Sequence, residues 1–367
     1  MKVGRYNYLA QFGDDADVLL CQLREMLLSG RYILSREVAD FEKAFAAYLG
    51  AEHVCGVNSG TDAIALTLQA LGLKAGDEVI TQANTFNATV AAIRIAGATP
   101  VLVDAEENSF LMDVSQLPDA VTSRTRVLMP VHLYGKPVPM EALIVLARDR
   151  GIDIVEDAAQ AHGAKINGKK VGTFGIASCF SFHPSKNLAA AGDAGAVATN
   201  NIQLARQFVL IRSLGQRAQN EHLVRGMNSK LDSLQAAVLL WKLPHLDKWN
   251  ARRRAVAGWY RECLAGLPLS FQAEGYNEEH AYHLFTIRTD RRDALLEHLL
   301  NAGVDAVVRY PTPIHLQPAF ADCGWRPGQF PVAERLAKEL VCLPIRPDMQ
   351  HDEVNYVGVC IRSFFGR

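Results

Sequence analysis

Several features are absent from this 367-residue sequence, and each absence excludes a class of protein. No uninterrupted apolar run reaches the ~20 residues that a membrane-spanning helix needs. The opening segment, MKVGRYNYLAQFGDD, lacks the apolar core of a signal peptide. The formal net charge is −1, so no excess of positive charge points to nucleic acid or to an anionic membrane. We therefore expect a cytoplasmic protein that binds neither.

Cysteine is present but follows no pattern. The seven cysteines are scattered, form no CxxC pair and show no spacing typical of metal ligands. Their odd number favours reduced thiols in a reducing compartment over a framework of disulfides. We expect no bound metal.

Short apolar segments alternate with amphipathic ones between residues 53 and 200. The pattern predicts helices at 62–71, 88–96 and 140–150, and strands at 53–57, 78–82, 99–105, 126–134, 152–157, 178–182 and 194–200. Such alternation is typical of a mostly parallel sheet covered by helices on both faces. Ligands of these sheets bind beyond the carboxyl ends of the strands.

The chain outside this region is more helical. Helices are predicted at 16–29 and 36–49, and a long one at 231–262 with a kink at Pro244. A strand at 283–289 and helices at 292–303 and from about residue 350 follow. We expect a large domain over 1–249 and a smaller α/β domain over 250–367.

Lys186 lies in SCFSFHPSKNLAAAGDAGA, after an apolar strand and before a run of small residues. Most lysines are solvated surface charges, but this context has no charged face around it. A lysine that loses water contacts can lose its proton and attack an aldehyde. We therefore treat Lys186 as a candidate nucleophile.

Two carboxylates, Glu156 and Asp157, end the predicted strand IDIVED. Strand alternation would place them on opposite faces. One of them could cap a helix. Asp157 could instead face a pyridinium nitrogen and keep an electron-accepting ring protonated.

A candidate phosphate site lies between the strand at 53–57 and the following helix. The segment Ser59-Gly60-Thr61 could simply cap that helix, but its backbone N–H groups also suit a phosphate. Ser181 could add a hydroxyl. Phe86, just past another strand, could stack on a flat ring or pack in the core.

Together these segments resemble the sugar aminotransferase family, which has the aspartate-aminotransferase-type fold of enzymes that use pyridoxal 5'-phosphate (PLP). The resemblance covers nearly the whole chain, in order, through SGRYILSREVADFEKAFAAYLG, NSGTDAIALTLQALGLKAGDEVI, PVHLYGKP, VEDAAQAHGA, SFHPSKN, GMNSKLDSLQAA and YPTPIHLQP. It implies an α/β fold of type I, with a large domain on a mostly parallel seven-stranded sheet and a smaller C-terminal α/β domain.

The resemblance also implies roles around the cofactor ring. Lys186 would carry PLP as a Schiff base and shuttle the proton. Asp157 would hold the pyridine nitrogen and Gln160 the ring hydroxyl. Phe86 would stack on the ring.

Further residues match family positions for the phosphate and the substrate. Gly60, Thr61 and Ser181 would bind the cofactor phosphate, and Asn228 would reach the phosphate of the neighbouring subunit. A homodimer with shared active sites is therefore implied. The positions that match the substrate pocket are His183, Tyr310 and His315.

Three positions need comment. Ser35 stands where the family usually has glycine, and His183 where tyrosine is also common. His162 is a family feature that we interpret as a satisfied structural histidine. Related PLP-dependent sugar dehydratases carry histidine in place of Lys186, which argues against that activity.

The family implies transfer of an amino group from L-glutamate, through the pyridoxamine form of the cofactor, to a nucleotide-linked keto-sugar. The segment GMNSKLDSLQAAVLLWKLPHLDKWNARRR most resembles enzymes for dTDP-3-keto-6-deoxyhexoses. A 4-keto sugar nucleotide, a cyclitol ketone and a non-catalytic regulator are the alternatives. The cations that could contact a diphosphate are Arg212, Arg217 and Arg225, although most arginines only coat surfaces.

Overall fold

A computed structural model describes residues 1–13 and 16–366. Its centre is a seven-stranded sheet in the order β1-β9-β8-β5-β4-β2-β3. The strands are β1 (His53–Val57), β2 (Glu78–Gln82), β3 (Thr99–Val103), β4 (Thr125–Leu128), β5 (Asp153–Asp157), β8 (Ala177–Ser181) and β9 (Gly195–Thr199). Only β9 runs antiparallel to its neighbours, β1 and β8. The prediction of a mostly parallel seven-stranded sheet is confirmed.

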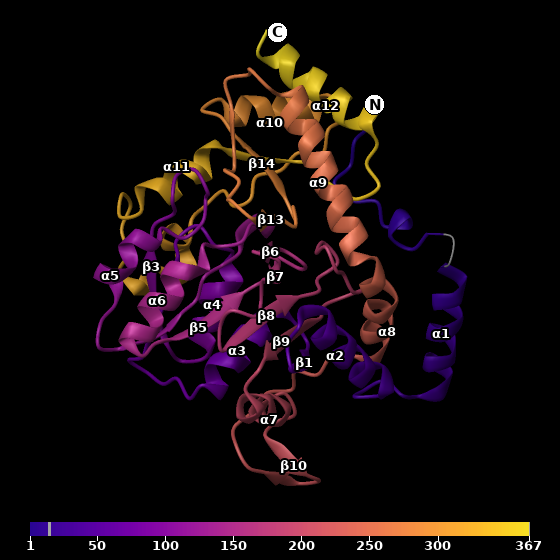
Figure 1. Ribbon diagram of the computed structural model, residues 1–367, viewed down its shortest axis with the longest axis vertical. Helices are drawn as coiled ribbons and strands as arrows, with labels where there is room; N and C mark the ends of the chain where they lie inside the picture. Colours follow the sequence, from indigo (N-terminus) through magenta and orange to yellow (C-terminus); the bar gives the residue numbers. More distant parts are fainter. Residues whose placement is uncertain (14–15, 367) are drawn as a thin grey trace.

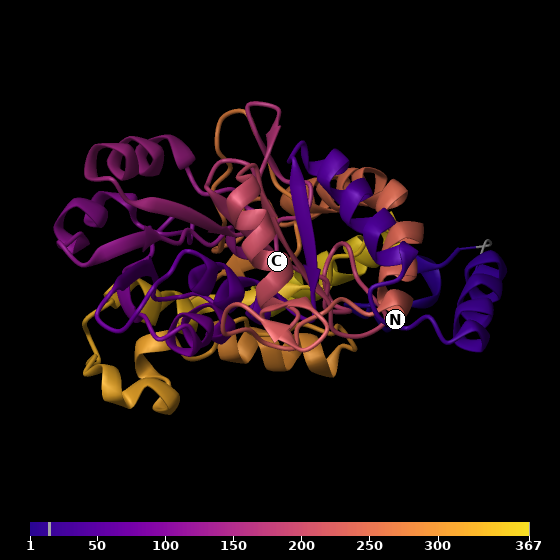
Figure 2. The ribbon, with the colours of Figure 1, turned by 90° about the horizontal axis from the view of Figure 1, so that it is seen from below.

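Helices cover both faces of this sheet (Figures 1 and 2). One layer contains α3 (Gly60–Ala70), α4 (Asn87–Ile95) and α7 (Ile202–Ile211), and the other contains α2 (Arg36–Leu49) and α8 (Ser233–Lys242). Successive side chains of β8 point to opposite faces of the sheet, so they pack against both helical layers. Cys179 Sγ lies 3.5 Å from Thr67 Oγ1 of α3. On the other face, the ring of Phe180 meets that of Phe45 of α2 at 5.1 Å.

The predicted kink at Pro244 is present. A 3-10 turn (Leu243–His245) joins α8 to α9 (Leu246–Cys263), because proline cannot supply the N–H that a continuous helix requires at that point. The long α9 leads from the central sheet to the second part of the molecule (Figure 1).

That second part is built on a three-stranded sheet of β12 (Ser270–Phe271), β14 (Phe285–Arg288) and β15 (Leu340–Leu343). Its core also takes side chains from α9, α10 (Arg292–Asn301) and α12 (His351–Phe364). Val3 belongs to the same core, and its N–H donates to Gly303 O at 3.0 Å. The N-terminal segment therefore packs on this sheet, and the domain division at residue 250 stays a prediction.

The remaining elements surround these layers, and one of them, α6 (Met140–Arg150), packs on the central sheet at β5. They are α1 (Ala16–Ser29), α5 (Leu117–Ala120), α6 (Met140–Arg150), α11 (Pro331–Glu339), the small sheet of β13 (Glu278–Glu279), β6 (Lys165–Ile166) and β7 (Lys169–Lys170), and the hairpin of β10 (Gln216–Ala218) and β11 (Glu221–His222). This hairpin projects from the foot of the molecule in Figure 1. Among the described residues, no helix has the length and apolar character to cross a bilayer.

One predicted strand is shorter than expected. The segment 126–134 forms a ladder only as far as Leu128, because Pro130 follows and cannot donate to a neighbouring strand. Beyond it the chain turns along β5, where His132 N–H donates to Asp157 O at 3.1 Å. This turn brings Val131 to the wall of the functional site.

Candidate active site

A pocket of about 380 Å³ lies at the carboxyl ends of the central parallel strands. Most of the residues that the sequence singles out line it. These are Gly60, Thr61, Phe86, Asp157, Gln160, Ser181, His183, Lys186 and Tyr310. Residues separated by as many as 250 positions in the chain thus share one cavity.

Lys186 enters the pocket from the turn that follows β8. Its N–H donates to His183 O at 2.8 Å, which closes that turn. Burial lowers the pKa of the Lys186 amine to about 8; Asp157 opposes this shift and Arg309 reinforces it. The amine is therefore substantially neutral at mildly alkaline pH and available as a nucleophile or base.

Asp157 ends β5 and lines the same pocket. Its carboxylate accepts hydrogen bonds from Thr89 Oγ1 at 2.8 Å and from Ala159 N–H at 3.1 Å. Burial raises the pKa of Asp157, and these two donors and Lys186 oppose that rise. A buried carboxylate of this kind is stabilised by a cationic partner, such as a protonated ring nitrogen.

Glu156 points to the opposite face of the sheet, as strand alternation predicts. Its carboxylate accepts N–H groups from Gly172, Phe174 and Gly175 at 2.7–2.8 Å, and His132 Nε2 lies 3.2 Å away. Burial alone would raise the pKa of Glu156, but His132 and the backbone donors lower it overall. Glu156 thus holds the loop before β8, and only Asp157 faces the pocket.

The amino end of α3 forms the other end of the pocket. Ser59 Oγ accepts the N–H of Asp62 at 3.1 Å and so caps the helix, as the simpler interpretation predicts. Gly60 and Thr61 still line the pocket, and a Cβ on Gly60 would lie 2.7 Å from the Cβ of Ser181. Glycine is therefore required where β8 meets the helix, and free N–H groups and the helix dipole favour an anion there.

Two aromatic side chains, inclined to each other, form part of the pocket wall. The rings of Phe86 and Tyr310 lie 5.1 Å apart at 31°, and 47% of Phe86 is exposed. Gln160 Nε2 donates to Tyr310 OH at 3.0 Å, and Tyr134 N–H donates to Gln160 Oε1 at 2.7 Å. Phe86 is therefore available to stack on a ring rather than packed in the core.

Several pocket residues escaped the sequence analysis. Thr89 could have been found, because it follows the carboxyl end of β2. His283 and Arg309 come from the second part of the molecule. Arg309 directly precedes Tyr310 and could have been found from that position, whereas nothing in the sequence around His283 indicates a site. Burial lowers the pKa of His283 well below its ordinary value, with Lys186 adding to the effect, so its imidazole is neutral.

The structure corrects the expectation for His315. Its side chain is fully buried outside the pocket, where Nε2 lies 2.9 Å from Glu334 Oε1. Asn228 is exposed beside the β10–β11 hairpin, where its Oδ1 accepts a hydrogen bond from Lys230 Nζ. It does not line this chain's pocket. The predicted role of Asn228 in a neighbouring subunit stays a prediction.

The arginines suggested for a diphosphate also lie elsewhere. Arg212 is buried in an ion pair with Glu42 and donates to Gly56 O at 2.8 Å. Arg217 pairs with Glu221 across the β10–β11 hairpin. Neither these two arginines nor Arg225 lines the pocket of this chain.

His162 packs between rings, but the prediction of a satisfied histidine is wrong, because both of its buried ring nitrogens lack hydrogen-bond partners among the described residues. Its ring centroid lies 5.6 Å from that of Phe180 and 5.5 Å from that of Phe182. Burial lowers the pKa of His162 to about 3, so the ring is neutral.

The residues present fit pyridoxal phosphate. The pocket offers an amine of lowered pKa for the aldehyde, a buried carboxylate for the ring nitrogen and an aromatic face for the ring. The glycine at the start of α3 allows close backbone approach to a phosphate. Fold and site together define an enzyme of the PLP-dependent transferase class.

Comparison with known proteins agrees with this class. The model of the DegT/DnrJ/EryC1/StrS aminotransferase family matches residues 15–362. The dTDP-3-amino-3,4,6-trideoxy-alpha-D-glucose transaminase of Streptomyces venezuelae is 44% identical over 346 residues, which cover 94% of this chain and 91% of that protein. The chain belongs to the DegT/DnrJ/EryC1/StrS aminotransferase family.

Two solved structures have the same fold. The crystal structure of S. venezuelae DesV in complex with a ketimine intermediate matches with a TM-score of 0.97 and 42% identity, covering 100% of this chain and 99% of that one. NtdA from Bacillus subtilis with bound cofactor PMP matches with a TM-score of 0.92 and 31% identity, covering 100% of this chain and 86% of that one.

Proposed function

We propose that this protein transfers an amino group from L-glutamate to a nucleotide-linked keto-sugar, specifically a dTDP-3-keto-6-deoxyhexose, with PLP as cofactor. The observation that carries the proposal is the Lys186 amine of lowered pKa in the same pocket as the buried Asp157 carboxylate. The sugar assignment is supported by a 44% identical relative, which is a dTDP-3-amino-3,4,6-trideoxy-alpha-D-glucose transaminase.

The cofactor would be held by residues at both ends of the pocket. Asp157 would hold the ring nitrogen, and Gln160 the ring hydroxyl. Phe86 would stack on the ring, and Gly60, Thr61 and Ser181 would hold the phosphate. When bound, PLP withdraws electrons from the substrate carbon that bears the nitrogen, which makes the C–H bond there acidic.

The protein's own chemistry then centres on one proton. Lys186 Nζ would accept the proton from the substrate carbon that bears the nitrogen. It would then return the proton to the carbon on the other side of that nitrogen. Both transfers require the neutral amine that burial favours. The ionised carboxylate of Asp157, held by Thr89 and Ala159, would keep the ring nitrogen protonated. The same residues serve both halves of a ping-pong reaction, because amine and ketone exchange at one site.

Substrate contacts would come from the mouth of the pocket. His183 is exposed there, and the hydroxyl of Tyr310 is held by Gln160. Asn228, exposed beside the β10–β11 hairpin, would reach the phosphate of a neighbouring subunit, so the active form would be a homodimer.

The test is direct amination by the purified protein. PLP, L-glutamate and a panel of keto-sugars are supplied: dTDP-linked 3-keto and 4-keto hexoses and a cyclitol ketone. The aminated products are detected by mass. The expected result is the highest kcat/KM for the dTDP-3-keto sugar. Preference for a simple keto acid over every sugar would reject the proposal, and failure of glutamate to convert the cofactor would favour a non-catalytic regulator.

A further inference from the structure

Tyr134 joins the central sheet to the second part of the molecule. It lies in the short turn Leu133–Gly135 that follows β4, and only 1% of it is exposed. Its φ of 64° is in the left-handed region, which bulky residues rarely adopt. Such a conformation persists where neighbouring contacts determine it, and it is frequent at functional sites. All three polar groups of Tyr134 are engaged, and each contact leads to a wall of the pocket.

The backbone N–H of Tyr134 fixes the orientation of the Gln160 amide. An N–H can only donate, so the amide atom that lies 2.7 Å from it must be the carbonyl oxygen Oε1. The amide nitrogen Nε2 then faces Tyr310 and donates to its hydroxyl at 3.0 Å. Because the hydroxyl oxygen accepts this bond, the Tyr310 proton is left over, and no acceptor for it lies within the part of the chain that the structure describes. Tyr310 is thus oriented as a donor into the pocket.

The side chain of Tyr134 holds Tyr310 from the other end. Its hydroxyl donates to the backbone carbonyl of Arg309, which directly precedes Tyr310. The carbonyl of Tyr134 accepts the N–H of Leu284 at 3.1 Å. The residues at the far ends of these bonds line the pocket: Gln160, Leu284, Arg309 and Tyr310. Tyr134 does not line it, so any effect of Tyr134 on the reaction must pass through those residues.

Both tyrosine hydroxyls keep their protons. Burial raises the pKa of Tyr134 well above its ordinary value of 10.0, and burial also raises the pKa of Tyr310. Arg309 and the hydrogen bond from Gln160 oppose the rise for Tyr310 only in part. Each hydroxyl is therefore a hydrogen-bond donor throughout the neutral pH range.

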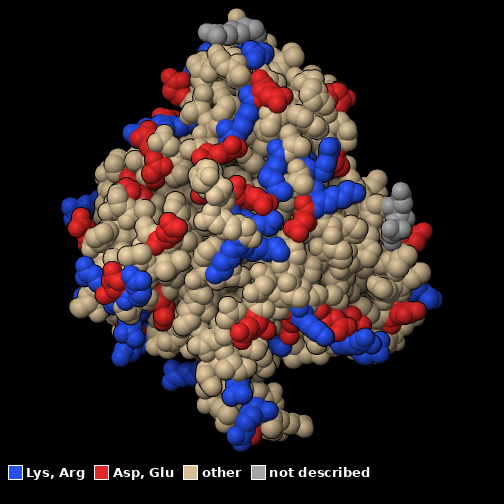
Figure 3. All heavy atoms as spheres, in the orientation of Figure 1, with Lys and Arg blue, Asp and Glu red and all other residues tan. Residues whose placement is uncertain are grey.

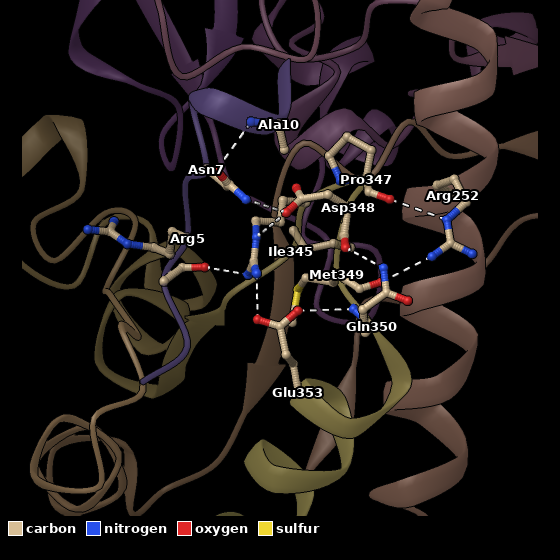
Figure 4. Close-up of polar contacts among 12 residues, drawn as sticks. Arg5, Asn7, Ala10, Arg252, Ile345, Pro347, Asp348, Met349, Gln350 and Glu353 are labelled. Carbon is tan, nitrogen blue, oxygen red and sulfur yellow. Dashed lines mark hydrogen bonds and ion pairs between the residues drawn. The ribbon is translucent and has the colours of Figure 1, made fainter. Parts of the chain in front are cut away.

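Other contacts hold the second part at places that do not adjoin the pocket. Asn7 Nδ2 donates to Asp348 at 2.9 Å (Figure 4), and Arg288 of β14 pairs with Glu107 at 2.9 Å. None of these four residues lines the pocket. Acidic and basic side chains are interspersed on the face drawn in Figure 3, and partly exposed ion pairs hold geometry only weakly. The buried turn after β4 is therefore the contact that fixes this wall of the pocket.

We propose that Tyr134 is a positioning residue for amino-group transfer: through Gln160 and the Arg309 carbonyl it holds the Tyr310 hydroxyl as a hydrogen-bond donor towards the bound substrate. The inference rests on the proposed function, in which Tyr310 contacts the keto-sugar. A donor must lie within hydrogen-bond distance of its acceptor, so a shift of about 1 Å at Tyr310 weakens that contact.

A double-mutant cycle with the holoenzyme tests this role. Tyr134→Phe removes only the hydroxyl, and kcat/KM for the keto-sugar is expected to fall about fivefold. Tyr310→Phe removes the donor itself and should cost about tenfold. If Tyr134 acts through Tyr310, the double variant loses about tenfold, whereas independent effects would multiply to about fiftyfold.

Tyr260→Phe is the matched control. Tyr260 is also fully buried, and its hydroxyl donates to Pro344 O at 2.9 Å, outside the pocket. Its replacement should lower the unfolding midpoint about as much as Tyr134→Phe does, because each leaves one buried carbonyl without its donor. We expect kcat/KM of Tyr260→Phe to equal that of the wild type. An equal loss of kcat/KM in Tyr134→Phe and Tyr260→Phe would assign Tyr134 a structural role only and overturn the inference.

A crystal structure of the Tyr134→Phe holoenzyme is the measurement that requires no substrate. Gln160 Nε2 and Tyr310 OH are expected to separate beyond ~3.5 Å, the limit of a hydrogen bond. Unchanged positions of both groups would overturn the inference, as would fully additive losses in the cycle. A wild-type protein that aminates no keto-sugar would instead reject the proposed function, and the crystal structure would still decide the role of Tyr134.

Discussion

At the scale of single residues, Lys186 and Asp157 have their pKa values displaced in opposite directions by the same cause. Burial lowers the pKa of the amine and raises that of the carboxylate. Each charge partly restrains the shift of the other. The cofactor ring would enter between an amine ready to react and a carboxylate in need of a cation, so both displacements favour its binding.

The lowered pKa of Lys186 predicts how cofactor attachment depends on pH. Only the neutral amine attacks the aldehyde, so the rate of covalent attachment of PLP to the apo-protein should rise with pH through about 8 and then level off. A solvated lysine would give a rate that still rises towards its ordinary pKa of 10.5. Stopped-flow absorbance at a series of pH values measures this, and a continued rise above pH 9.5 would contradict the prediction.

Replacement of the carboxylate tests the electronic role of Asp157. Asp157→Asn keeps the shape but cannot hold the ring nitrogen protonated, so kcat should fall by about 100-fold or more. Thr89→Val removes one hydrogen bond to the carboxylate and leaves its charge, so it should cost about tenfold or less. Single-turnover rates with glutamate measure both changes. Similar losses in the two variants would show that the hydrogen bond, and not the charge, is essential.

A residue of the site could be predicted from the sequence where its neighbours are unusual for a residue of its type. Asp157 and Lys186 stand out because a charge follows a buried strand. Arg309 has no such context, and it reaches the pocket only because the second part of the molecule folds back on the sheet. The prediction that His315 lies in the substrate pocket was wrong for a related reason. Its partner Glu334 lies on α11, and the sequence does not reveal that contact.

At the scale of elements, the phosphate end of the pocket depends on how closely α3 approaches β8. A Cβ on Gly60 would lie 2.7 Å from Cβ and 3.2 Å from Cα of Ser181, so the helix start must shift to admit a side chain. Gly60→Ala should therefore weaken PLP binding by about tenfold or more, through displaced N–H groups. Equilibrium titration of the apo-protein measures this. Gly72→Ala, at the far end of α3, is the control for the general effect of replacing a glycine. An equal loss of PLP affinity in the two variants would contradict the prediction.

The helices and strands could be predicted where burial of one face makes apolar residues recur at regular intervals in the sequence. β1, β2, β8 and the paired helices α8 and α9 lie within one or two residues of their expected limits. The β10–β11 hairpin was not predicted, because its strands are two or three residues long and polar, without an apolar face. Parallel pairing follows from the alternation of strands and helices, but which strand lies antiparallel depends on contacts that only the folded chain makes.

At the scale of the whole molecule, the surface around Asn228 is unusual for an isolated chain. Leu214, Leu223 and Val224 are exposed on the arm that carries the β10–β11 hairpin, and Val209 of α7 is exposed beside it. Exposed apolar groups that lie together are typical of a surface that a partner covers. A second copy of the chain is the partner that the proposed role of Asn228 requires.

Mixed dimers would decide whether Asn228 serves its own pocket or that of its neighbour. Lys186→Ala and Asn228→Ala should each be nearly inactive alone. If Asn228 acts across the interface, a heterodimer contains one intact site, with Lys186 from one chain and Asn228 from the other. Unfolding and refolding an equal mixture should then restore about a quarter of the wild-type activity, because about half of the dimers are mixed and each has one intact site of two. Refolded single variants are the controls. If Asn228 serves its own chain, every site in the mixture lacks one residue and no activity returns, whatever the oligomeric state.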